Sequence, residues 1–299
     1  METGKAVWVT PDIRRVLAGN PSPMTATGTN SYLIGRGKGI VLVDPGPDLP
    51  DHIEALMAAL APGETIGAIV VTHAHRDHSA AARPLATRTG APILAFGDAT
   101  SGRSPLMERL SRAGMAGGGE GADLEFRPDA TLTDGQTLPV GDHGPLRVIH
   151  TPGHMGGHIA LAWRDVLFSG DHAMGWASSL ISPPDGDMRA YIGSLEKLLA
   201  EPWSLMLPGH GPQVESPGQR LRALLDHRLQ REAEVLAALA EASGTPPALA
   251  ARIYRETPPA LLTAAARNVL AHLIDLTERN QISADGTHGL ETNYASRDF

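Results

Sequence analysis

The stretch Val71-Thr-His-Ala-His-Arg-Asp-His78 follows the apolar run Ile66-Gly-Ala-Ile-Val-Val71 and is the most informative segment of the chain. Four side chains able to bind a metal fall within six consecutive positions: His73, His75, Asp77 and His78. The apolar run predicts a buried strand, so these polar side chains lie at its carboxyl end. Crowded histidine and aspartate side chains beside a core are unfavourable unless a cation binds them. We therefore predict a metal site at this strand end.

Three later motifs also place an Asp or His just past a predicted strand, beside a Gly or Pro that turns the chain: His150-Thr-Pro-Gly-His154, Phe168-Ser-Gly-Asp171 and Leu207-Pro-Gly-His210. Side chains at the ends of several strands can converge on one point above a sheet. The candidate ligands are then His73, His75, Asp77, His78, His154, Asp171 and His210. They form two sets of three and one carboxylate with two oxygens to share, as two metal ions about 3.5–4 Å apart require.

Imidazole and carboxylate ligands indicate the cofactor and its chemistry. They suit zinc best, and manganese and iron use the same ligand types. We expect two zinc ions per chain, with manganese or iron as alternatives. A water molecule bridging two such ions would be hydroxide near neutral pH, because coordination lowers its pKa to about 7. No protein nucleophile is then required.

Composition limits the class of protein. The 299 residues include no cysteine, which excludes disulfides and thiolate metal ligands, and the formal net charge of -8 argues against broad attraction to nucleic acid or anionic lipid. A local basic path stays compatible with this charge. The sequence shows neither an apolar run of membrane-spanning length nor a signal peptide at its start, so we expect no membrane association and a cytoplasmic location.

The pattern of predicted elements changes near Pro217. Short strands alternate with helices before it, one of these helices being predicted over 79–89. After it, helices are predicted over 219–242, 247–254 and 258–278, with a possible terminal hairpin. We therefore expect two domains, residues 1–216 and 217–299. The glycine-rich stretch 113–122 is predicted to be a flexible loop.

The ordered motifs resemble those of the metallo-β-lactamase superfamily: Thr72-His-Ala-His-Arg-Asp-His78, then His154, Asp171 and His210, over residues 28 to about 215. The resemblance implies an α+β fold, a four-layer αββα sandwich of two mixed sheets covered by helices. It also implies that His73, His75 and His154 hold one metal ion. By the same resemblance, Asp77, His78 and His210 hold the other, and Asp171 bridges the two.

Further motifs are similar to the lactamase-beta-like protein two group: Asn20-Pro-Ser-Pro-Met-Thr25, Gly28-Thr-Asn-Ser-Tyr-Leu33, and Thr151-Pro-Gly-His154 with His158. This likeness implies a C-terminal winged-helix-like domain, a loop over 20–30 bordering the substrate cleft, and endoribonuclease activity on single-stranded RNA. Lactamases of the best-studied subclass use a cysteine at the second metal, so an antibiotic-resistance role is not expected.

Several other side chains have alternative interpretations. Asp77, Asp171 and His158 are the candidate catalytic residues, and His158 either contacts the substrate or leaving group or simply packs. Asp44 is expected to orient a ligand histidine. His150 is interpreted as structural, and His172 as a neighbour of the site. A solvated helix face is the favoured account of four arginines, with an RNA path as the alternative: Arg220, Arg222, Arg228 and Arg231.

Four functions compete for this ligand set. The first, which the sequence favours, is a dinuclear hydrolase in which the bridging hydroxide attacks phosphodiester bonds of single-stranded RNA. The second is a thioesterase resembling hydroxyacylglutathione hydrolases, acting on a small ester or thioester. The third is a binding protein with structural metals, which seven ligands disfavour. The fourth is a flavin-containing diiron oxidoreductase. It would need a flavodoxin-like domain, which the sequence does not show. The sequence leaves the oligomeric state open.

Overall fold

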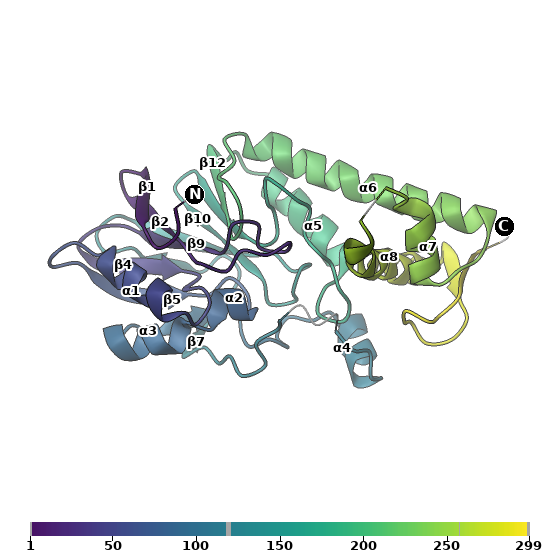
Figure 1. Cartoon of the computed structure of the whole chain (residues 1–299), viewed down its shortest axis with the longest axis horizontal. Coiled ribbons are helices and arrows are strands. Elements are labelled where there is room, and N and C mark those ends of the chain that lie inside the picture. Colours follow the sequence, from purple (N-terminus) through teal and green to yellow (C-terminus); the bar gives the residue numbers. More distant parts are fainter. Residues whose placement is uncertain (1, 118–120, 257, 298–299) are drawn as a thin grey trace.

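Two β-sheets form the interior of the N-terminal part of the molecule, and the C-terminal helices lie beside it (Figure 1). The computed structural model describes residues 2–117, 121–256 and 258–297, so residues 118–120 of the predicted loop lie outside the described part. The seven strands of the first sheet follow one another in chain order: β1 Ala6–Thr10, β2 Ile13–Leu17, β3 Asn30–Ile34, β4 Lys38–Val43, β5 Thr65–Val70, β6 Ile93–Ala95 and β7 Ala130–Thr131. The first four pair antiparallel and the last four parallel, which makes this sheet mixed.

The second sheet has five strands, whose spatial order is β12 Leu205–Pro208, β11 Val166–Gly170, β10 Ile159–Trp163, β9 Pro145–His150 and β8 Thr137–Pro139. Only β11 and β12 pair parallel within it. Strands β5, β11 and β12 end at the same edge of the sandwich. The Gly209 N–H just past β12 donates to the Gly170 carbonyl oxygen at the end of β11 at 2.8 Å. The Thr72 carbonyl oxygen, just past β5, accepts from the Ile159 N–H at the start of the antiparallel neighbour β10 at 2.9 Å. The ends of three strands therefore meet at one place.

Apolar side chains point to both faces of each sheet, and their packing on either side produces the four layers. Side chains from both sheets share one core, exemplified by Tyr32 and Phe168, whose rings meet edge to face at 5.3 Å between centroids. The other face of the first sheet is covered by α1 (Pro50–Ala58) and α3 (Ala82–Thr89). The other face of the second sheet is covered by α5 (Met188–Leu199) and the start of α6 (Pro217–Glu241). The αββα sandwich predicted from the sequence is confirmed.

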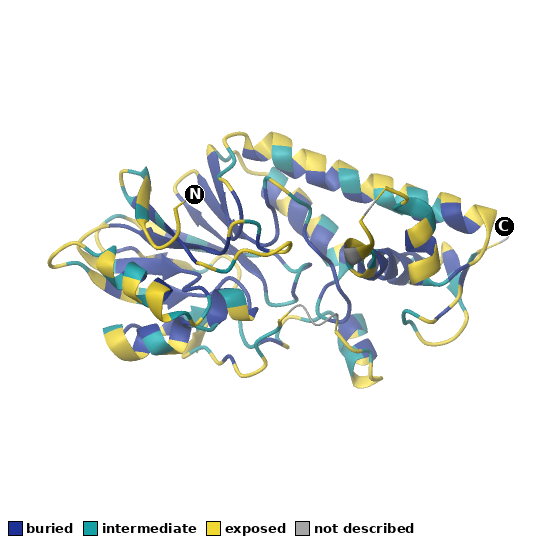
Figure 2. Ribbon diagram, in the orientation of Figure 1, coloured by how far each residue is buried: buried dark blue, intermediate teal, exposed yellow. Residues whose placement is uncertain are grey.

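The C-terminal part has a separate core, to which Met107 and Leu110 of α4 (Pro105–Arg112) also contribute. Helices α6, α7 (Pro246–Ile253) and α8 (Pro259–Glu278) pack with the hairpin of β13 (Ile282–Ala284) and β14 (Tyr294–Ser296). Figure 2 shows its buried interior. The first turns of α6 instead bury Leu221 and Leu224 against α5. The domain boundary at 216/217 stays a prediction. Among the described helices, none has the length and apolar character needed to cross a membrane.

The structure corrects one predicted helix and adds elements that were not predicted. The helix expected over 79–89 is interrupted, because α2 (Arg76–Ser79) begins earlier and a separate α3 follows. The hairpin of β1 and β2 was missed, as were β7, β8 and α4 (Pro105–Arg112). In β2, Arg14 is only 3% exposed and pairs with Glu64 at 2.6 Å, so a buried charge conceals the apolar pattern of this strand.

Acid is expected to destabilise the protein through His272 on α8. This side chain is 1% exposed, and among the described residues neither ring nitrogen has a hydrogen-bond partner. Burial, and then the nearby Arg228, lowers its pKa to about 3. The unfolded chain, with an ordinary pKa of about 6.5, binds one more proton below that pH. Folding stability therefore falls as the pH drops below about 6.5, by about 1.4 kcal/mol per pH unit from this residue.

Urea unfolding at pH 7.5 and pH 5.5 measures this effect. The variant His272→Leu is expected to lose less stability between the two pH values than the parent protein does, whereas His143→Gln in a partly exposed turn is expected to match the parent. An unchanged pH dependence in His272→Leu would show that the buried ring does not titrate on unfolding.

Candidate metal centre

The candidate ligands come from four places along the sandwich edge. His73 and His75 follow β5, and Asp77 and His78 lie in the short helix α2. The other three follow strands β9, β11 and β12: His154, Asp171 and His210. The structure brings all seven together in three overlapping groups, each with its ligand atoms within 4.8 Å of one another and each able to hold a metal ion. The spacing of the motifs along the strands accounts for this convergence.

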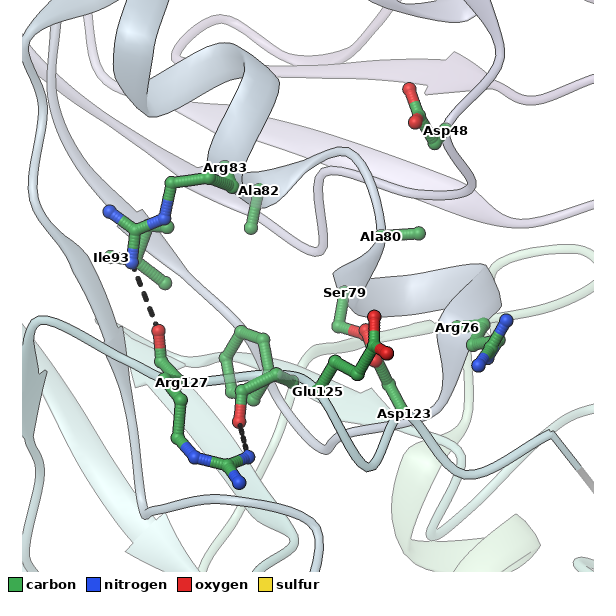
Figure 3. A pocket seen from close by; sticks show the side chains of 11 residues that line it. Asp48, Arg76, Ser79, Ala80, Ala82, Arg83, Ile93, Asp123, Glu125 and Arg127 are labelled. Atoms are coloured by element: carbon green, nitrogen blue, oxygen red, sulfur yellow. Dashed lines mark hydrogen bonds between the residues drawn. The ribbon is translucent and has the colours of Figure 1, made fainter.

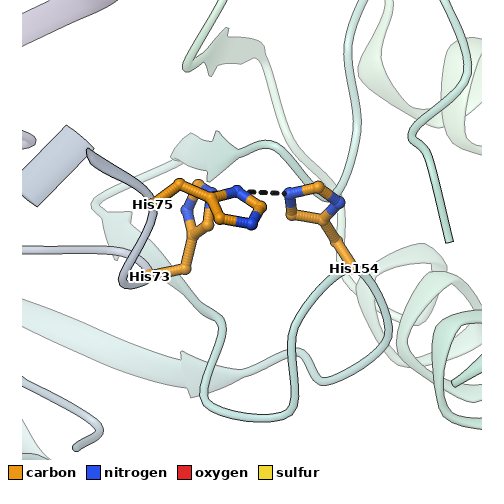
Figure 4. Close-up of side chains that lie close together, drawn as sticks. All are labelled: His73, His75 and His154. Atoms are coloured by element: carbon orange, nitrogen blue, oxygen red, sulfur yellow. Dashed lines mark hydrogen bonds between the residues drawn. The ribbon is translucent and has the colours of Figure 1, made fainter. Parts of the chain in front are cut away.

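The first group consists of three imidazoles (Figure 4). His75 Nδ1 lies 2.9 Å from His73 Nε2 and 3.1 Å from His154 Nε2. His154 Nδ1 donates to the carbonyl oxygen of Leu180 at 2.8 Å, which leaves its Nε2 lone pair facing His75. Burial lowers the pKa of His73 well below its usual range and that of His75 to about 3. Both imidazoles are therefore neutral, the form that binds a metal.

The second group combines two imidazoles with a carboxylate. His210 Nε2 lies 3.2 Å from His78 Nε2 and 3.2 Å from Asp77 Oδ2. Burial alone would lower the pKa of both histidines, but neighbouring carboxylates, Asp171 foremost, raise the pKa of His78 well above its usual range and that of His210 to about 9. Protons on His78 and His210 therefore supply the positive charge that balances the neighbouring carboxylates.

Asp171 lies between the two groups. Its Oδ2 is 3.2 Å from His210 Nε2 and 3.9 Å from His73 Nε2, and its Oδ1 is 3.4 Å from His78 Nε2. Burial would raise the pKa of this carboxyl, but His210 and His78 hold it well below its usual range. Buried Oδ1 has no hydrogen-bond partner within the described chain. A buried carboxylate close to imidazole nitrogens of both groups, with one oxygen that lacks a hydrogen-bond partner, fits a pair of divalent cations.

Three further histidines surround this cluster without joining it. His158 is fully buried: its Nδ1 lies 2.8 Å from Thr151 Oγ1, and its Nε2 accepts from the Asp171 backbone N–H at 3.2 Å. It therefore supports Asp171 from behind and has no exposed atom with which to contact a substrate. His172 is also fully buried, and His150 stacks on Phe96 at 4.0 Å between ring centroids. Both positions agree with the structural interpretation.

Asp44 supports the cluster from beneath. Its carboxylate accepts hydrogen bonds from Thr72 N at 2.7 Å and Thr72 Oγ1 at 2.9 Å, and lies 2.9 Å from His78 Nδ1. The Asp44 backbone adopts the left-handed region at φ 50°, a conformation that costs a non-glycine residue about 1–2 kcal/mol. These three contacts hold the residue there and orient His78 Nε2 towards Asp77 and Asp171.

Asp44→Asn is expected to weaken metal binding at the second group by about 10–100-fold, since a partner that orients a ligand histidine contributes that much. The amide has one acceptor oxygen in place of two, so its NH2 must face either the Thr72 N–H or the pair formed by the Thr72 hydroxyl and His78 Nδ1. Chelator competition on the purified variant measures the affinity, and Asp48→Asn, an exposed carboxylate nearby, is the control. Equal metal affinities in both variants would show that Asp44 does not contribute to the metal site.

A cleft of about 430 Å³ opens onto the cluster and connects it with the C-terminal helices. Five candidate ligands line it: His75, Asp77, His154, Asp171 and His210. Pro23, Met24 and Thr25 form part of its wall, as predicted for the loop over 20–30. The wall from the C-terminal part includes residues that the sequence did not indicate: Leu261, Ala264, Ala265 and Asn268. These residues line the cleft only because helix α8 packs beside the sandwich.

A second cavity, of about 420 Å³, lies on the outer side of α2 and α3 (Figure 3). Its lining is rich in charge: Arg76, Arg83, Asp123, Glu125 and Arg127. Ser79 donates to Asp123 Oδ2 at 2.7 Å along its floor. Arg76 therefore projects away from the cleft, although the two residues beside it are candidate ligands.

Comparison with known proteins defines the class of this chain. Residues 24–210 match the Metallo-beta-lactamase superfamily, and residues 245–289 match the Beta-lactamase associated winged helix domain. The chain therefore belongs to the metallo-beta-lactamase superfamily, whose members are metal-dependent hydrolases that bind divalent metals. Helix α6 lies between the two matched ranges.

Individual relatives agree with this placement. The Beta-lactamase-like protein 2 homolog of Drosophila melanogaster is 30% identical over 285 residues, covering 92% of this chain and 90% of the relative. The Atrochrysone carboxyl ACP thioesterase of Aspergillus chevalieri is 29% identical over 239 residues, covering 78% of this chain and 67% of the relative. The crystal structure of a Beta-lactamase domain protein from Burkholderia ambifaria has the same fold, with a TM-score of 0.80 at 24% identity over 99% of this chain and 94% of that one.

Proposed function

We propose that this chain is a dinuclear metal-dependent hydrolase of thioesters or esters with an apolar acyl group. The observation that carries the proposal is the cleft, which joins the ligand cluster to an apolar wall. The ions are proposed to be two zinc ions, one held by His73, His75 and His154, the other by Asp77, His78 and His210, with Asp171 between them. Manganese or iron would fit the same ligand types.

When bound, the ions supply Lewis acidity and a water ionised near neutral pH. The side chains of this chain then have distinct roles. Asp77, 27% exposed and lining the cleft, orients a water molecule beside the substrate. Asp171 places its charge at the centre of the cluster, where positive charge must be compensated. His158 fixes the backbone of Asp171 through the 3.2 Å hydrogen bond from its N–H, so it is proposed as a positioning residue.

The lining of the cleft supports an apolar substrate group. Away from the cluster, most of the lining is apolar: Pro23, Met24, Met174, Trp176, Ala177, Leu180, Leu261, Ala264 and Ala265. Three of these are large and still substantially exposed, Met24 at 47%, Trp176 at 39% and Leu261 at 39%. Exposed apolar side chains around a cleft gain free energy when a ligand covers them, at about 25 cal/mol per Å². An aromatic or branched acyl group would cover them.

The cations of the cleft are already engaged, which disfavours a polyanion. Arg231 pairs with Glu234, and Arg228 is buried against backbone oxygens. Burial lowers the pKa of His227, so this ring is neutral at pH 7. Binding of RNA depends on cationic contacts to successive phosphates. Within the described lining, the groups that would make them have other partners or no charge.

Single-stranded RNA is the second candidate substrate, with cleavage of its phosphodiester bonds. Trp176, 39% exposed, lines the cleft, and an exposed aromatic ring beside a catalytic centre can stack on an unpaired base. The match to a winged helix domain is compatible with this alternative. The net charge of -8 opposes it.

A matched substrate panel tests the proposal on the purified protein with added zinc or manganese. It contains an aromatic-acyl thioester, the acetyl thioester of the same thiol, S-lactoylglutathione and labelled single-stranded RNA, with Asp171→Asn as the control for contaminating activity. We expect kcat/KM to be highest for the aromatic-acyl thioester. Cleavage of the RNA with no turnover of any thioester would replace the first candidate by the second, and inactivity on all four would reject both.

A further inference from the structure

The segment 179–183, which follows the Asp171 loop, supports two candidate ligands directly. The Leu180 carbonyl oxygen accepts from His154 Nδ1 at 2.8 Å. The Ser179 hydroxyl lies within hydrogen-bond distance of the backbone oxygens of Asp171 and His172. Because a carbonyl can only accept, the contact at Leu180 fixes the proton of His154 on Nδ1 and leaves Nε2 free to bind a metal. The position of this segment therefore controls the orientation of the candidate ligand His154.

Side chains from the C-terminal helices hold that segment in place. Arg228 on α6 donates from Nη2 to the Ser179 carbonyl oxygen. Asn268 Oδ1 on α8 accepts from the backbone N–H of Ile181 at 3.0 Å and lies 3.4 Å from Arg228 Nη1. Two helices thus fix the residues immediately before and after Leu180. Arg267 continues the same pattern, since its Nε donates to Ser182 Oγ at 2.9 Å.

Arg228 is an unusual choice for helix packing alone. It is 1% exposed, and in the described residues no carboxylate lies within ion-pair distance of it, although Tyr191 lies under its guanidinium at 5.1 Å. Burying a cation without a counter-ion is unfavourable unless its hydrogen bonds are made in a defined geometry. An apolar residue of similar size would pack at this position at lower cost. The buried fork of donors instead fixes the direction of the Ser179 carbonyl. The sequence had favoured a solvated face for this arginine, and burial shows that this prediction was wrong.

We propose that Arg228 and Asn268 are positioning residues of the metal centre, through which the C-terminal helices fix the Leu180 carbonyl and thereby the orientation of His154. Neither residue touches the cluster. Their effect passes through the backbone of segment 179–181. The C-terminal part is then a component of the first metal group as well as a wall of the cleft. This inference rests on the ligand set of the proposed function.

Metal affinity, rather than activity, tests the proposal, because both residues also line the cleft. Chelator competition and the visible spectrum of the cobalt-substituted protein are measured for four variants of the full chain: Arg228→Met, Asn268→Leu, Asn268→Asp and Arg222→Met. We expect Arg228→Met and Asn268→Leu to bind the more loosely held ion about 10–100-fold more weakly and to shift the cobalt spectrum. Asn268→Asp keeps the acceptor and is expected to retain the parent affinity. Arg222→Met removes an exposed charge from the same helix and is expected to do the same.

Urea unfolding of the metal-free variants separates positioning from packing. A purely structural role would lower the stability of the metal-free protein and leave affinity and cobalt spectrum unchanged, which would overturn the proposal. If Arg228→Met does not fold, the pair Asn268→Leu and Asn268→Asp decides the question. Failure of the parent protein itself to bind two ions would reject the proposed function, whereas equal affinity in all variants would reject only this inference.

Discussion

Asp171→Asn is expected to lower kcat by about a thousandfold or more and to reduce the number of tightly bound metal ions. The carboxylate faces imidazoles of both groups, with Oδ2 3.2 Å from His210 Nε2 and 3.9 Å from His73 Nε2. An amide has nearly the same shape, but it is neutral and carries a donor. Its NH2 would point at imidazole lone pairs and occupy the space that a cation requires. Lewis acidity contributes several kcal/mol to such reactions, and each 1.36 kcal/mol corresponds to tenfold in rate.

The stability of the metal-free variant distinguishes this explanation from misfolding. Replacing Asp171 by Asn removes the carboxylate that pairs with His78 and His210 in the metal-free protein, so the metal-free variant is expected to be less stable than the metal-free parent. It is still expected to unfold in one cooperative transition, whereas a misfolded variant would show none. Metal content by elemental analysis, steady-state kinetics and thermal unfolding are measured together, with the exposed Asp142→Asn as control. Full activity, or two retained ions, would show that Asp171 does not bridge.

The family resemblance implied the sandwich, and local sequence patterns predicted its central strands because these are apolar on both faces. Residues 66–71 and 166–168 form the apolar runs, and the opposite sheet covers one face of each strand while helices cover the other. The first hairpin was missed because β2 contains Arg14, whose charge is compensated by Glu64 fifty residues later in the chain. An ion pair between residues so far apart in the chain leaves no periodic pattern in the sequence. The helix at 79–89 was predicted too late because the ligand motif itself begins helix α2 at Arg76.

The candidate ligands could be found from the sequence because all of them follow predicted strands, four within one motif and three beside a Gly or Pro. The residues that orient the ligands are less visible. Leu180 acts through its carbonyl oxygen, a group that every residue carries, so its identity gives no signal. Arg228 and Asn268 lie on separate helices and meet at this segment only after the C-terminal part has packed on the sandwich. Side-chain chemistry is encoded locally, whereas support through the backbone depends on tertiary packing.

Gly209→Ala is expected to disrupt the metal centre with a single methyl group. A Cβ at this position would lie 2.4 Å from Asp171 Oδ1 and 2.7 Å from His78 Cε1, far inside van der Waals contact. Neither neighbour can retreat easily. Asp171 is held by the hydrogen bond from its N–H to His158, and His78 by Asp44 at 2.9 Å. The backbone of Gly209 lies outside the left-handed region, so alanine adds no backbone strain. The clash of the added methyl group with Asp171 and His78 therefore accounts for the whole expected effect.

The displaced carboxylate should weaken metal binding by about 100-fold or more, since even orienting partners of ligands contribute about 10–100-fold. Gly218→Ala in the first turn of α6 is the matched control, because a Cβ there meets no atom within 4 Å. Alanine in a helix is favoured over glycine by about 0.5–1 kcal/mol, so the control should be slightly more stable and bind metal normally. Chelator competition and thermal unfolding of both variants measure the difference. If Gly209→Ala bound two ions as tightly as Gly218→Ala, Asp171 and His78 would not be required as ligands in the positions that the structure shows. Glycine is therefore expected at 209 because the strand end must approach two ligands more closely than any side chain permits.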